Sequence, residues 1–269
     1  MADYEKMDTP EVQRLAKQGD KDALYEMAWR MAPDVQRDPV ESCAWQDYWF
    51  EKAADAGNVV AKRRYARSLI DRVMNAEDRQ KALGYFQSLS DDYDAGILSG
   101  EQREEGIIGK LWLGVMLCEG YHTRRDAVKG SELIQTADKF YNGFEGFGFG
   151  VMSKIGELYA SGLAQPGEEP SVADLEKAIK YLDIAVKRFN PERDDPNNRG
   201  FLQLTKEQLE NQKKRIVNKM SMGDDNTTFS GAGERRRQMM EISEPARQRM
   251  EADKAALTRL RQRLTREGW

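Results

Sequence analysis

Large apolar residues and small residues recur along the chain in one fixed layout. A large apolar residue is followed at once by Ala or Gly and, three positions later, by another large residue, as in Ile155, Gly156 and Tyr159. Large residues four apart lie on one face of a helix, and the small residue lets a second helix approach closely. The small residues are Ala28, Ala66, Gly114 and Gly156, at intervals of 38, 48 and 42 residues. The pattern predicts four repeats that each begin with a helix.

A second helix is expected in every repeat. The predicted second helices cover residues 42–56, 78–89, 126–140 and 173–189. Gly57 directly follows the first of these helices and is a typical helix stop. Residues 14–18 indicate one more second helix, which would begin at Thr9 and Pro10. A single helical hairpin cannot bury its apolar face, so the hairpins must stack. The prediction is an all-α fold, an α-solenoid of stacked helical hairpins, with an insertion around residues 91–106.

These repeats resemble the Sel1-like repeat family, a relative of the tetratricopeptide repeats. The family pattern is Ala-x-x-x-Leu-Gly-x-x-Tyr-x-x-Gly, followed by Asp-x-x-Lys-Ala and Lys-Ala-Ala-x-x-Gly. The matching residues are Ile155, Gly156, Tyr159, Gly162, Asp174, Lys177 and Ala178 in the fourth repeat, and Leu113, Gly114, Gly120, Asp126 and Lys129 in the third. The first two repeats depart from it, with Ala for the pattern's Gly and Met31 or Leu69 for its Tyr. The resemblance spans residues 10–190. It implies a tetratricopeptide-like superhelix that binds other proteins, in a family whose bacterial members include regulators and adaptors.

The last part of the chain is predicted to differ from the repeats. Thr205 and Gln208 form a capping-box pattern that opens a capping helix, and Ser243 and Pro245 begin a final helix. Apolar residues follow one face of the final segment in steps of three and four: Met239, Ile242, Ala246, Met250, Leu257, Leu260 and Leu264. The predicted domains are a repeat solenoid with its capping helix at 1–222, a linker at 223–233 and a basic amphipathic C-terminal helix at 234–269.

Composition and charge narrow the class of protein. The chain has 269 residues, 33% of them charged, and no apolar run in the first twenty. Neither a signal peptide nor a membrane contact is therefore expected. Cys43 and Cys118 match no metal-ligand spacing, which indicates a cytoplasmic protein unless a leader peptide has been removed. Residues 234–269 contain ten Lys or Arg and six Asp or Glu, a net charge of +4. Because the whole chain has a net charge of −4, residues 1–233 have a net charge of −8. The acidic body disfavours nucleic-acid binding.

No catalytic, cofactor or metal site is predicted. The one histidine, His122, stands in a turn without Cys or carboxylate partners at ligand spacing. The acidic run at 91–94 lacks oxygen ligands at several positions of a calcium loop and is interpreted as a solvated loop. The glycine-rich residues 146–150 lack the Lys and the Ser or Thr of a phosphate-binding loop. The prediction is a protein that is not an enzyme and needs no cofactor.

A protein partner is expected on the concave side of the solenoid. In the related tetratricopeptide solenoids the first helix of each pair lines that side, and its exposed positions lie two before and two after a large core residue. The predicted partner-binding groove consists of Tyr25, Trp29, Arg63, Arg67, Leu111, Val115 and Glu157. Trp, Tyr and Arg dominate binding hot spots, and an exposed apolar stretch favours a partner. The sequence thus predicts a scaffold or adaptor that binds a peptide or helix of another protein.

Two other functions stay open at this point. In the first, the C-terminal helix lies in its own chain's groove or pairs with another copy, which gives an autoinhibited or self-associating regulator. In the second, the tail binds RNA or DNA through Arg235, Arg236, Arg237, Arg259, Arg261, Arg263 and Arg266. Interleaved Glu residues and the lack of stacking aromatics other than Trp269 weaken this second alternative.

Overall fold

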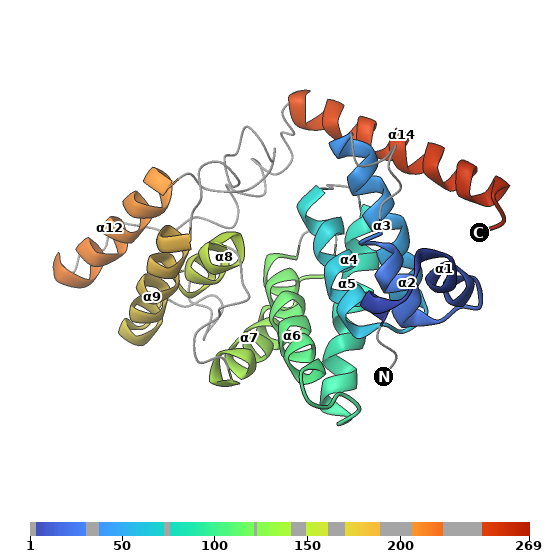
Figure 1. Ribbon diagram of the computed structural model, residues 1–269. Coiled ribbons are helices and arrows are strands. Elements are labelled where there is room, and N and C mark those ends of the chain that lie inside the picture. Colours follow the sequence, from blue (N-terminus) through green and yellow to red (C-terminus); the bar gives the residue numbers. More distant parts are fainter. Residues whose placement is uncertain are drawn as a thin grey trace. The chain divides into compact units, whose positions relative to one another are not determined.

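Every regular element that the structure, a computed structural model, describes is a helix (Figure 1). The described residues are 4–30, 38–72, 76–120, 123–140, 149–160, 170–188, 206–222 and 244–269. The predicted linker at 223–233 lies outside them, as do His122 and residues 146–148 of the glycine-rich segment. The predicted all-α fold is confirmed.

Two compact units make up the chain. The first unit is Met1–Gly109 together with Glu244–Trp269, and the second is Lys110–Ser243. The first unit holds η1 (Tyr4–Lys6), α1 (Thr9–Lys17), α2 (Lys21–Met27), α3 (Pro39–Asp55), α4 (Val59–Arg72), α5 (Ala76–Asp94) and α14 (Glu244–Arg266). The second holds α7 (Ala127–Phe140), α8 (Phe149–Ala160), α9 (Val172–Arg188) and α12 (Lys206–Met222). Helix α6 (Gln102–Glu119) begins in the first unit and ends in the second.

Helix ends follow the capping residues. The Asp8 carboxylate accepts a hydrogen bond from the Glu11 backbone N–H at the start of α1, with Pro10 in the first turn. Asp38 caps α3 in the same way, directly before Pro39. Side-chain oxygens at these positions satisfy backbone donors that the helix itself leaves unpaired. Gly57 ends the α3 segment with a φ of 91°, a left-handed conformation that glycine adopts without strain.

Consecutive helices pack on one another within each unit. In the first unit α1 packs on α2, α2 on α3, α3 on α4 and α4 on α5; in the second, α8 packs on α9 and α9 on α12. The predicted second helices of the repeats correspond to α3, α5, α7 and α9, with ends that differ by a few residues. Stacked helical hairpins, the architecture of an α-solenoid, are therefore present.

Close helix crossings occur at the small residues of the repeat pattern. A Cβ atom added to Gly156 in α8 would lie 2.8 Å from Leu182 Cγ in α9 and 3.2 Å from the backbone oxygen of Ala178. A Cβ atom on Gly114 in α6 would lie 2.8 Å from the backbone oxygen of Gly130 in α7. The predicted purpose of these glycines, close approach of the second helix, is confirmed.

A four-residue network joins neighbouring hairpins in the first unit. The Lys81 ammonium of α5 lies 5.4 Å from the ring centre of Tyr65 in α4. The Tyr85 hydroxyl, one turn further along α5, donates a hydrogen bond to Asp55 of α3. The network thus ties the second helix of one hairpin to both helices around it.

The second unit contains the same network at the equivalent positions. The Lys177 ammonium of α9 lies 5.0 Å from the ring centre of Tyr159 in α8. The Tyr181 hydroxyl donates a hydrogen bond to Asp138 of α7. The same set of side-chain contacts thus recurs at two interfaces between successive hairpins, as expected for repeats of one structural element.

The predicted insertion lengthens two helices. Helix α5 continues to Asp94, and α6 begins as early as Gln102. The extended ends pack together, because a Cβ atom on Gly106 would lie 2.7 Å from Tyr93 Cβ and 2.8 Å from Leu98 Cδ1. The expectation of a solvated loop over the acidic residues 91–94 is therefore wrong, because this segment is the last turn of α5.

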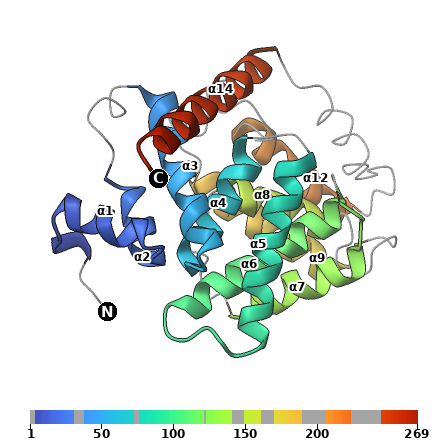
Figure 2. The same cartoon turned by 90° about the vertical axis from the view of Figure 1, so that its right-hand side faces the viewer.

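The C-terminal helix packs on the first unit. Figures 1 and 2, two views at right angles, both show α14 lying against α3. Leu260 and Leu264 of the predicted apolar face are fully buried, four residues apart on one side of α14. The third fully buried residue is Ala256 rather than the predicted Leu257, which is only partly buried. The division of the chain at residues 222 and 233 stays a prediction.

Candidate partner-binding surface

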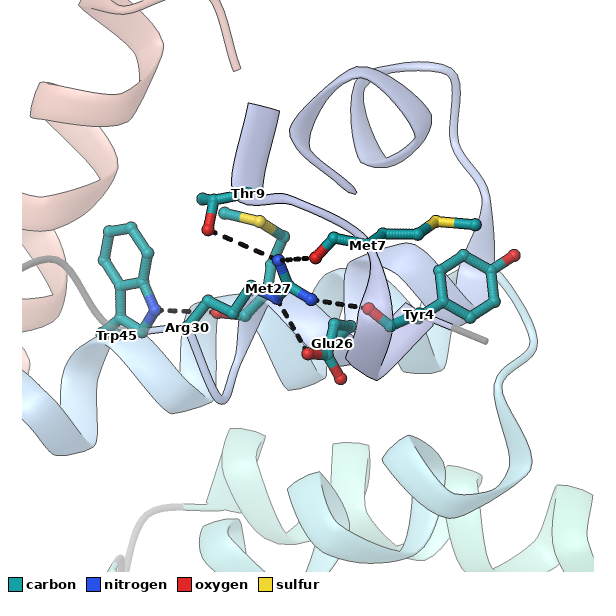
Figure 3. Close-up of polar contacts among 7 residues, drawn as sticks. All are labelled: Tyr4, Met7, Thr9, Glu26, Met27, Arg30 and Trp45. Carbon is teal, nitrogen blue, oxygen red and sulfur yellow. Dashed lines mark hydrogen bonds and ion pairs between the residues drawn. The ribbon is translucent and has the colours of Figure 1, made fainter. Parts of the chain in front are cut away.

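The segment that carries Trp29 is held firmly at the end of α2. The Arg30 guanidinium donates hydrogen bonds to the backbone oxygens of Met7, at 2.9 Å, and Tyr4, at 2.6 Å (Figure 3). It also pairs with Glu26 at 2.8 Å. From α3, the Trp45 Nε1–H donates to the Met27 backbone oxygen at 3.0 Å. These contacts satisfy backbone groups at the helix end and fix the backbone on both sides of Trp29.

Trp29 is exposed at the centre of an aromatic cluster. Its side chain is 45% exposed, although its ring contacts Tyr25 and Phe50 edge-on, at centroid distances of 6.1 and 5.5 Å. The Arg64 guanidinium of α4 lies 4.9 Å from the Trp29 ring centre, within the range of a cation–π interaction. The ring is thus held in place and still presents surface to solvent.

The two predicted arginines of α4 are only partly exposed. Arg63 forms an ion pair with Glu105 of α6, and Arg67 also makes a polar or ring contact within the protein. The arginine that lies over Trp29 is Arg64, the residue next to the predicted one. The helical spacing placed Arg63 and Arg67 at the outer positions, but contacts with neighbouring helices decide which guanidinium reaches the aromatic ring.

Leu111 and Val115 are buried, with exposed fractions of 1% and 0%. The expectation that they form an exposed apolar stretch is therefore wrong. Residues 111–118 of α6 are buried on several sides at once, since Trp112, Leu113 and Met116 are buried as well, and a helical segment that is apolar all round lies inside a protein. The absence of charged residues between Lys110 and Glu119 is the sequence signal from which this burial could have been predicted.

Glu157 is also buried rather than exposed, at 9%. Gln212 of the capping helix α12 lies 3.5 Å from one of its carboxylate oxygens. The prediction assumed that Glu157 is open to a partner, whereas Gln212 of α12 lies beside it. Of the predicted groove residues, the structure leaves an exposed surface at Trp29 and part of Tyr25, Arg63 and Arg67, all in the first unit.

The described residues show little that points to chemistry. No group of three or more His, Cys, Asp or Glu side chains in the described ranges could hold a metal ion. Of the cysteines, Cys43 is exposed, and burial raises the pKa of Cys118 to about 12, which keeps that thiol protonated and unreactive at neutral pH. Helices long and apolar enough to cross a membrane are absent from the part of the chain that the structure describes.

The solved structures that this chain resembles include two repeat proteins. A protective antigen of uropathogenic Escherichia coli with an SLR fold matches 93% of this chain at a TM-score of 0.47 and 17% identity. This chain spans 42% of the antigen's length. A structure from Klebsiella pneumoniae described as a sel1 repeat protein matches 77% of this chain and 82% of its own, at a TM-score of 0.37 and 20% identity. No protein-family model and no curated protein sequence matches the chain. The descriptions of both neighbours name the type of repeat whose motifs this sequence resembles.

Proposed function

We propose that the protein is a non-enzymatic interaction scaffold that binds a peptide or helix of another protein. The binding surface is the exposed face of Trp29 together with Tyr25, Arg63 and Arg67 in the first unit. Leu111, Val115 and Glu157 are buried and contribute no direct contact to this surface.

The half-exposed Trp29 carries this proposal. Tryptophan and arginine are the residues most enriched among binding hot spots, and a ring that is already fixed loses little conformational entropy when a partner binds. Two edge-on aromatic contacts, Arg64 over the ring and the anchored backbone on either side provide that fixation.

The test compares the proteins that Trp29→Ala and the unchanged chain capture from the source lysate. For each protein captured in different amounts, the dissociation constant is then measured with both chains. We expect loss of the partner, with an affinity at least about thirtyfold weaker, the effect of removing a hot spot worth 2 kcal/mol. Trp29 is preferable to Arg63 as the first target, because Arg63→Ala would also break the ion pair with Glu105.

Phe140→Ala is the matched control. Phe140 is an exposed aromatic residue at the end of α7 in the second unit, so its removal should leave capture unchanged. A partner that binds Trp29→Ala as tightly as it binds the unchanged chain would show that the binding surface lies elsewhere.

A further inference from the structure

The face of α3 beneath α14 has an apolar centre made largely of aromatic rings. Trp49 contacts Trp269, which follows α14, edge-on at a centroid distance of 4.9 Å. The Arg263 guanidinium of α14 lies 6.0 Å from the Trp45 ring centre, and Lys17 of α1 lies 4.5 Å from that of Trp269. We call this face, with Glu41, Trp45, Trp49 and Glu51, the α3 seat.

Opposite charges flank the apolar centre. Arg259 pairs with Glu41 at 2.7 Å, and Arg261 pairs with Glu51 at 2.5 Å. Glu51 is also paired with Lys81 of α5. Burial alone would raise the pKa of Glu51, but Lys81 and Arg261 outweigh it and hold that pKa below its usual range. The seat is therefore acidic at neutral pH and suits a basic amphipathic helix.

The α14 helix is not a member of a repeat hairpin. The chain leaves the first unit at Gly109 and returns to it only at Glu244, and the two ion pairs join residues 218 and 210 positions apart. Of its described residues only Ala256, Leu260 and Leu264 are fully buried, whereas both of the pairing arginines are exposed. Few buried groups and exposed ion pairs are features of elements that open locally.

We propose that the α3 seat is an exchangeable helix-binding site that accepts α14 from a second copy of this chain as well as its own. Seat and helix belong to one sequence, so any two copies carry complementary surfaces with identical contacts. Exchange of an identical element between copies needs no new interface. The balance between the two arrangements then depends on the effective concentration of the chain's own helix.

A peptide of residues 244–269 with a fluorescent label stands for the second copy's helix. It is titrated against the full-length Leu264→Asp chain, in which a charge at a buried position weakens docking of the chain's own α14 and leaves the seat unchanged. We expect saturable one-to-one binding in fluorescence anisotropy. The unchanged chain should bind the peptide at least about tenfold more weakly, because its own helix occupies the seat.

A charge swap shows whether the peptide uses the seat. Glu41→Arg in the Leu264→Asp chain should weaken binding of the unchanged peptide about threefold or more, and a peptide with Arg259→Glu should recover it. If Leu264→Asp loses its helical circular dichroism, Arg259→Glu with Arg261→Glu, both exposed positions, replaces it. The proposal is overturned if a folded helix-defective chain does not bind the peptide, or if the unchanged chain binds it equally well.

Discussion

Single small residues determine how closely the two helices of a hairpin pack. Gly156 and Gly114 stand at the same position of the repeat pattern, and both lie where a neighbouring helix leaves no room for a Cβ atom. Gly84, in the interior of α5, has no atom within 4 Å of the place where its Cβ would lie. Close packing therefore requires glycine at positions 114 and 156 but not at position 84. Only the requirement at positions 114 and 156 follows from the repeat pattern.

Gly156→Leu is expected to lower the free energy of unfolding by roughly 1–3 kcal/mol, because the added side chain overpacks the contact with Leu182. Gly84→Leu, the matched change at an open position, should cause no loss and a gain of up to about 1 kcal/mol from helix propensity. Urea denaturation followed by circular dichroism measures both. Equal stability of Gly156→Leu and the unchanged chain would mean that α8 and α9 do not cross at Gly156.

At the scale of elements, α14 shows how a helix outside the repeats can pack into a compact unit made of repeats. Its apolar residues lie at three- and four-residue steps, which made an amphipathic helix predictable. Its neighbour was not predictable, because the sequence contains no local signal that connects it to α3. The expected neighbour was the chain's own groove or another copy, whereas in the structure it packs on the second helix of the first hairpin.

Leu264→Ala should destabilise the protein by about 2–5 kcal/mol, since the side chain is 1% exposed and its removal leaves a cavity against the seat. Arg259→Ala should cost less than about 1 kcal/mol, because water already surrounds most of the side chain that pairs with Glu41. Thermal unfolding of the two variants checks the difference. A larger effect for Arg259 than for Leu264 would mean that charge, rather than apolar contact, holds α14.

At the scale of the whole molecule, both units contain buried tyrosines at their hairpin interfaces. Burial, with nearby carboxylates, raises the pKa of Tyr65 and Tyr85 in the first unit and of Tyr159 and Tyr181 in the second well above the usual value of 10. Hydrogen bonds to carboxylates add to the rise for Tyr65, Tyr85 and Tyr181. In the unfolded chain these phenols ionise near pH 10. The unfolded state therefore loses protons that the folded state keeps.

Stability should fall as the pH rises above about 10, since the contribution of a raised pKa is complete below the unfolded value and is lost above it. Urea unfolding at pH 8, 10 and 11 measures the effect. Tyr85→Phe removes one such group together with its hydrogen bond to Asp55, and should lower stability at pH 8 while it reduces the slope above pH 10. A pH-independent stability over this range would show that the tyrosines are not buried as described.

The sequence by itself determined the helical repeats, their order and the positions of close crossing, because these depend on periodicity and side-chain size within about forty residues. Tertiary structure alone decided which outer positions stay exposed. Leu111, Val115 and Glu157 match the groove pattern as well as Trp29 does, yet they are buried, while Arg64 rather than Arg63 lies over the Trp29 ring. Exposure depends on every helix that packs around a residue, and the contacts of α14 with α3 join positions more than 200 residues apart. No local pattern contains that information, because it arises only when the whole chain is packed.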